Sequence, residues 1–83
     1  MHFALTLNKQ RQQYLISLGK NILMVRKDKN MSQQDVANKC SVDRSSLGKI
    51  ENGKIAVHVI TVAEIAKALG VEVGSLMPPH LLD

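Results

Sequence analysis

The stretch Met31–Lys54, MSQQDVANKCSVDRSSLGKIENGK, holds two short amphipathic helix patterns separated by only three or four residues. Ser32 is a good N-cap for the first pattern, with Asp35 as the acid of a capping box, and Asp43 is the cap candidate for the second. Asn52-Gly53 then supplies a strong helix stop. Two helices joined through so short a turn predict a helix-turn-helix unit.

The packing side and the outer side of this unit differ sharply in chemistry. Ala37 supplies the small residue that a close helix crossing needs. The inward-facing positions are all apolar or weakly polar: Val36, Cys40, Val42, Leu47 and Ile50. The outer face of the second helix carries no large apolar side chain: Arg44, Ser45, Gly48, Lys49 and Asn52. That face is therefore either solvated or in contact with something polar.

Helical patterns also surround the unit. An apolar stripe with spacings of four, four and three indicates a helix over about residues 8–29: Tyr14, Leu18, Ile22 and Val25. A bend or interruption at Gly19 stays open, and Asn30 stands where a left-handed residue often ends a helix. Downstream, Thr61 and Glu64 form a capping-box pattern for a helix that ends at Gly70. A last turn over 74–77 precedes two prolines. No strand pattern is convincing, so we expect an all-α fold of five helices with an extended N-terminal helix.

Size and composition narrow the class of protein. Eighty-three residues make a single domain, 1–83, which buries roughly 60% of its unfolded surface, so we expect a second chain to add stability. One cysteine excludes an internal disulfide, and three scattered histidines give no metal-ligand spacing. Residues 1–17 resemble neither a signal peptide nor a membrane span, which favours a cytoplasmic protein without a membrane partner.

Charge and aromatic content point to the kind of partner. A net charge of +4 and a pI near 9.5 favour polyanions, although many ordinary proteins share such a balance. With only one Phe and one Tyr, the chain lacks the stacking platforms that single-strand binding needs. No nucleophile–base pair, carboxylate pair or phosphate loop is visible, so we expect neither an enzyme nor a cofactor.

Three motifs resemble those of a known family. Ser32-Gln33-Gln34 leads into Val36-Ala37, Leu47-x-x-Ile50-Glu51-Asn52-Gly53-Lys54 follows, and Ala-Leu-Gly-Val occupies 68–71. In order and spacing they are similar to the helix-turn-helix regulators typified by Cro and the lambdoid-phage repressors (XRE-like), over about residues 18–77. Two positions depart from that pattern. The family's turn carries a left-handed glycine where Ser41 stands, and serine there costs about 1 kcal/mol, so we expect a turn of different shape. Gly48 is unfavourable inside a helix, and both close approach to DNA and neutral change stay open as reasons.

The resemblance implies a regulator of transcription that binds double-stranded DNA as a homodimer on an inverted-repeat operator. By that likeness, the third helix enters the major groove and three residues reach base edges: Arg44, Ser45 and Lys49. Three others bind backbone phosphates: Gln33, Asn52 and Lys54. Arg26 pairs with Glu51 and ties the first helix to the end of the third. The side-chain chemistry agrees, because the planar fork of arginine matches the two acceptors of guanine.

The segment IAVHVI, residues 55–60, is more apolar than a solvent-facing loop requires. Since the family often dimerises through this loop and the last helix, the candidate interface residues are Val57, Val59, Ile60, Leu76, Met77, Leu81 and Leu82. That these residues only cover the core of the monomer remains an alternative. A different alternative for function is an antitoxin-like or accessory subunit whose main partner is another protein, because fold alone does not fix function.

Overall fold

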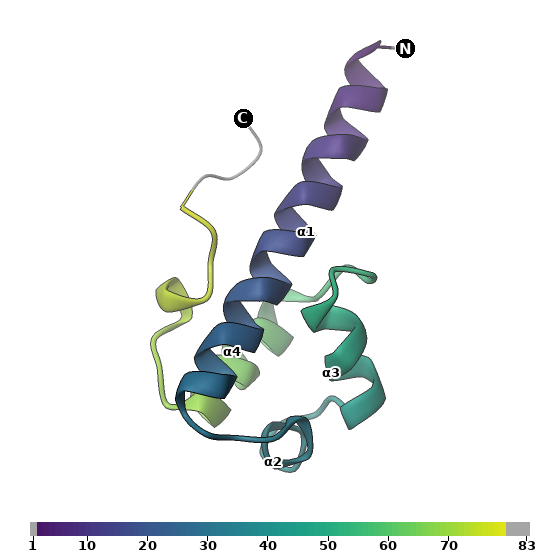
Figure 1. Ribbon diagram of the computed structural model, residues 1–83. Helices are drawn as coiled ribbons and strands as arrows, with labels where there is room; N and C mark the ends of the chain where they lie inside the picture. Colours follow the sequence, from purple (N-terminus) through teal and green to yellow (C-terminus); the bar gives the residue numbers. More distant parts are fainter. Residues whose placement is uncertain (1, 80–83) are drawn as a thin grey trace.

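The computed structural model describes the backbone of residues 2–79 and the side chains of residues 8–79, and this part of the chain is all-helical (Figure 1). Its elements are α1 (His2–Asp28), α2 (Gln33–Ala37), α3 (Arg44–Glu51), α4 (Val59–Leu69) and the 3-10 turn η1 (Val73–Ser75). The expected fifth helix is thus a single 3-10 turn, which Pro78 and Pro79 prevent from continuing. None of the described helices is both long and apolar enough to cross a bilayer.

Helix α1 runs without a break through Gly19, so the interruption that the sequence left open there does not occur. Gly19 instead lets α1 approach the end of α3: a Cβ at this position would lie 2.6 Å from the carbonyl oxygen of Glu51 and still closer to that of Ile50. The helix also begins at His2, six residues before the predicted start. As Figure 1 shows, the first half of α1 projects beyond the rest of the fold.

Local capping explains where α1 ends and where α2 and α3 begin. Asn30 adopts a left-handed conformation with φ 56°, as predicted, and the Met31 N–H donates to the Arg26 carbonyl at 3.1 Å. At the start of α2, the Ser32 hydroxyl accepts from the Asp35 N–H at 3.0 Å while Asp35 accepts from the Ser32 N–H at 2.9 Å. Asp43 caps α3 by accepting from the Ser46 N–H at 2.7 Å. These three predicted signals are confirmed.

The start of α4 differs from the prediction. His58 is its N-cap, with Nδ1 accepting from the Ile60 N–H at 3.3 Å, so the helix begins at Val59 and the expected capping box at Thr61 is wrong. Glu64 has another partner because its carboxylate accepts a hydrogen bond from the Ser41 hydroxyl in the turn between α2 and α3. Ser41 is not left-handed, so this turn does have a different shape from one built on glycine.

The core lies where α1, α2, α3 and α4 meet, and it confirms the predicted inward faces. One fully buried member comes from each of the four α-helices and one follows η1: Ile22, Val36, Leu47, Ile65 and Leu76. Cys40 and Val42 pack against this cluster with partial burial. The packing fixes α3 against α1 and α2 and leaves its opposite side free.

Candidate nucleic-acid interface

Helix α3 presents a polar outer side because its two apolar residues are used internally. Leu47 and Ile50 are buried, with exposed fractions of 0% and 4%. Arg44, Ser45 and Lys49 are exposed on the other side of the same eight-residue helix. The three residues predicted to read bases therefore share one solvent-facing surface, with no large apolar side chain among them.

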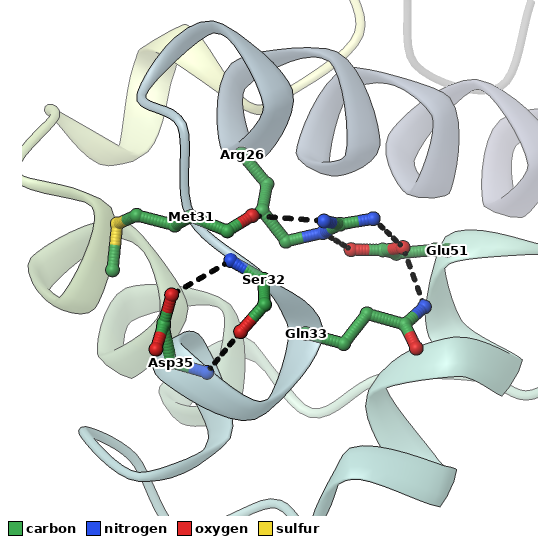
Figure 2. Close-up of polar contacts among 6 residues, drawn as sticks. All are labelled: Arg26, Met31, Ser32, Gln33, Asp35 and Glu51. Atoms are coloured by element: carbon green, nitrogen blue, oxygen red, sulfur yellow. Dashed lines mark hydrogen bonds and ion pairs between the residues drawn. The ribbon is translucent and has the colours of Figure 1, made fainter.

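A buried polar network holds this helix in place (Figure 2). Arg26 binds Glu51 through two parallel hydrogen bonds, Nε to Oε2 at 2.7 Å and Nη2 to Oε1 at 3.1 Å. Its Nη1 also donates to the Met31 carbonyl at 2.9 Å. Both side chains are nearly inaccessible, at 10% and 3% exposed. The predicted Arg26–Glu51 pair is thus present and buried, and it joins the end of α1 to the end of α3.

Gln33 is the third member of the network and buttresses α3 from the start of α2. Its Nε2 donates to Glu51 Oε1 at 3.0 Å, so one carboxylate receives donors from α1 and α2 at once. An amide nitrogen carries two N–H groups, and this bond uses one of them. Gln33 is half-buried at the start of α2, so its second N–H is held in a fixed direction beside α3.

The turn after α3 places two more predicted residues at the surface. Asn52 and Lys54 are exposed on either side of Gly53, which has a φ of 69°. The turn is held by a bond from the Lys54 N–H to the Lys49 carbonyl at 2.9 Å. A second bond runs from Gln12 Nε2 on α1 to the Gly53 carbonyl at 3.1 Å. Gln12 was missed because nothing in the sequence indicates which turn α1 lies beside.

The caps of α2 and α3 add fixed negative charge near this surface. Hydrogen bonds from the Ser46 N–H and hydroxyl hold the pKa of the Asp43 carboxyl below its usual range, and those from Ser32 do the same for Asp35. Both carboxylates stay ionised at neutral pH and accept hydrogen bonds from backbone N–H groups at the helix starts. The exposed side chains free to meet an anion are thus the cationic and amide groups of α3 and its turn.

The candidate interface residues fall into four groups. Val59 and Ile60 are 67% and 63% exposed at the start of α4, while Val57 and Met77 are partly buried against the core. Leu76 must be corrected: its exposed fraction is 0%, so it fills the monomer core and offers no surface to a second chain. Leu81 and Leu82 lie outside the described residues.

Comparison with known proteins gives a consistent set of relatives. The helix-turn-helix family model matches residues 22–76. Control protein C.BamHI of Bacillus amyloliquefaciens is 36% identical over 66 residues, covering 78% of this chain and 75% of that protein. The immunity repressor protein of Bacillus phage phi105 is 29% identical over 67 residues, 81% of this chain; the match spans 46% of the repressor, less than half its length.

Among solved structures, the restriction-modification controller protein C.AhdI from Aeromonas hydrophila superposes with a TM-score of 0.77 at 29% identity. The superposition covers 80% of this chain and 96% of the controller. Nearly all of that structure is thus matched, while a fifth of this chain lies outside it. The family model begins only at Ile22, so most of α1 precedes the residues that this model matches.

Proposed function

The chain belongs to the helix-turn-helix family of Cro and phage-repressor type regulators, and from this premise we propose that it is a sequence-specific regulator that binds an inverted-repeat operator as a homodimer. Residues 18–77 form the core of its DNA-binding domain, within a single domain of residues 1–83. It acts by binding alone, without a cofactor, in the cytoplasm. The observation that carries the proposal is the exposed polar side of α3, held rigid by the buried Arg26–Glu51–Gln33 network.

Base readout is the role of three residues on α3: Arg44, Ser45 and Lys49. Arg44 lies in the first turn, where an arginine fork can donate to both O6 and N7 of a guanine in the major groove. Lys49 lies five residues further along the helix and reaches the same kind of acceptor. Rigidity matters here, because side chains on a helix that rocked against the core could not hold a bidentate geometry.

Phosphate binding is the role of Gln33, Asn52 and Lys54, which all lie near the C-terminal end of α3. The remaining N–H of the Gln33 amide and the exposed amide of Asn52 donate to phosphate oxygens, and Lys54 adds a positive charge. Such contacts set the register of the protein on the duplex and leave sequence choice to α3.

Dimerisation is assigned to the exposed apolar start of α4. Val59 and Ile60 are consecutive in sequence and are both more than 60% exposed, while Val57 and Met77 are partly buried against the core. Leu81 and Leu82, which lie outside the described residues, complete the proposed set. Two copies joined through this surface should place their α3 helices about 34 Å apart, which demands half-sites one helical turn apart.

In-vitro selection from a pool of random duplexes tests the proposal directly. We expect enrichment of a two-fold symmetric consensus, which supports both the dimer and base readout. Enrichment of a single unrepeated half-site would overturn the dimer and leave readout standing. If no sequence is enriched even at low salt, the regulator proposal fails, and co-purification with another protein becomes the measurement to make.

A further inference from the structure

We propose that the projecting half of α1 is a second DNA-contacting element, in which Lys9 and Arg11 bind backbone phosphates adjacent to those bound by Asn52 and Lys54. The inference rests on the proposed function, because it extends the same interface. It concerns a part of the chain that precedes the family match at Ile22. Its occupant is the sugar-phosphate backbone, recognised through charge without readout of bases.

The first observation is where α1 lies. Gln12 donates to the carbonyl of Gly53, so α1 passes directly beside the turn that carries Asn52 and Lys54. The contact is tight along the helix: a Cβ on Gly53 would lie 2.7 Å from the Ile16 Cα. Figure 1 shows α1 continuing past this turn as an uninterrupted helix. Residues one turn before Gln12 are therefore held next to the proposed phosphate contacts by a rigid rod.

The second observation is the charge of this rod. No Asp or Glu occurs before Asp28, whereas Lys9, Arg11 and Lys20 precede Arg26. Lys9 and Arg11 are both exposed, and among residues 8–79 neither lies within ion-pair distance of a carboxylate. A like-signed surface that runs from α1 into Lys54 is complementary to a polyanion.

The third observation is that distances between residues along α1 are similar to the spacing of phosphates along DNA. Lys9 precedes Gln12 by three residues, which is about 4.5 Å along a helix axis. Successive phosphates of one DNA strand are spaced about 3.4 Å apart along the duplex axis. Lys9 and Arg11 can therefore reach phosphates within one to three nucleotides of those at the turn. Because the rod is already folded, little conformational entropy is lost when these contacts form.

Salt dependence of binding to the selected operator tests the proposal. The variants are Lys9→Gln and Arg11→Gln, with Lys67→Gln, an exposed lysine of α4, as the matched control of equal charge change. Each lost phosphate contact should reduce the slope of log K against log salt by about 0.9. When salt is raised from 50 to 200 mM, the fold-decrease in affinity should be roughly three times smaller for each of the first two variants than for the wild type. The control should keep the wild-type slope.

Ethylation interference on the same operator locates the contacts. Lys9→Gln should remove interference at a phosphate adjacent to the one lost with Lys54→Ala, and the base consensus should not change. Unchanged slopes and interference for both α1 variants, with the operator still bound, would overturn this inference alone. A loss of dimer mass in sedimentation instead of a change in slope would also overturn it, because α1 would then contact a second copy. Failure of the wild type to bind any duplex would instead sink the proposed function.

Discussion

Glu51 is the residue on which the geometry of the site depends most. Its carboxylate accepts hydrogen bonds from Arg26 and Gln33, and its side chain is 3% exposed. Replacing it with alanine would leave the Arg26 guanidinium buried without its counter-charge. Removing one partner of a buried ion pair costs about 3–5 kcal/mol. We therefore expect Glu51→Ala to lower the free energy of unfolding by that amount, measured by urea denaturation.

Glu72→Ala is the matched control, because Glu72 is exposed and should change the stability by no more than about 0.5 kcal/mol. Equal effects of the two substitutions would show that the network contributes no more than a surface charge. The double variant Arg26→Met/Glu51→Leu should recover much of the lost stability, since it removes both charges together.

Arg44 and Lys54 should differ in the kind of affinity that they supply. Arg44→Ala removes a base contact, so we expect a loss of about 1–3 kcal/mol on the best operator and a relaxed preference at particular base pairs. Lys54→Ala should weaken binding to every duplex equally and give a shallower salt slope. A panel of single-base operator variants, titrated with each protein, measures both.

A uniform loss across the panel for Arg44→Ala would remove Arg44 from the base-reading set. An unchanged salt slope for Lys54→Ala would remove Lys54 from the phosphate set. Lys67→Ala, on α4, serves as the reference for nonspecific loss of charge in both comparisons.

Two glycines show how a helix element depends on close packing. A Cβ at Gly19 would press on the carbonyl oxygens of Ile50 and Glu51, backbone atoms that move only if α1 and α3 separate. Gly19→Ala should therefore destabilise the protein by about 1–3 kcal/mol, as overpacking does. A Cβ at Gly48 would meet only the Gln33 amide, at 3.6 Å. Gly48→Ala should thus stabilise α3 by up to about 1 kcal/mol.

Thermal unfolding of the two alanine variants measures this contrast. Equal changes in Tm would contradict it. Operator affinity of Gly48→Ala then decides between the two reasons left open for this glycine. Weaker binding by a more stable protein would indicate that DNA approaches the backbone at Gly48, and unchanged binding would exclude that reason.

The Asp43 cap makes the start of α3 sensitive to acid. Its pKa is lowered in the folded state by the hydrogen bonds of Ser46, so the folded protein favours the ionised carboxylate. Stability from this group is fully present above its unfolded pKa and is lost as pH falls through the lower, folded value. We expect Tm to drop less steeply with acidification in Asp43→Asn, which keeps a cap oxygen without a titrating proton.

That comparison is made by following Tm from neutral pH down to acid pH in both proteins. Parallel curves would show that Asp43 contributes nothing to the pH dependence. Asp35, whose pKa is also lowered, remains in both proteins and cancels from the difference.

At the scale of the helices, the sequence predicted the helix ends that are set by neighbouring residues. It did not predict the features that depend on contacts between residues far apart in the chain. The caps Ser32 and Asp43 and the stop at Asn30 satisfy their own helix ends, so short patterns reveal them. The start of α4 was misjudged because Glu64 bonds with Ser41, 23 residues away, and not with its own helix end. Among the site residues, the exposed side of α3 followed from periodicity, whereas the link from Gln33 to Glu51 required the folded chain.

At the scale of the whole molecule, the dimer is the feature that one exposed residue can test. Ile60 is 63% exposed, so a lysine there should leave the monomer folded. In the proposed interface it would place a charge in an apolar contact. We expect Ile60→Lys to lower the mass in analytical ultracentrifugation from two chains to one and to weaken operator binding strongly.

Met24→Lys is the control, since Met24 is 59% exposed on α1, outside the proposed interface. A dimer that survives Ile60→Lys would remove the start of α4 from the interface. The monomeric variant should still bind a single half-site with the same base preference, because the readout residues lie on α3.

The three-way hydrogen bonding at Glu51 has a practical consequence for redesign of specificity. The hydrogen bonds that hold α3 join Glu51 to Arg26 and Gln33. Arg44, Ser45 and Lys49 take no part in them. A segment transplanted from a related regulator at positions 44–49 would thus inherit its orientation from the recipient. Operator preference could thus be changed by exchanging residues 44–49 alone. A graft that also replaced Glu51 would lose the hydrogen bonds that hold α3 against the core.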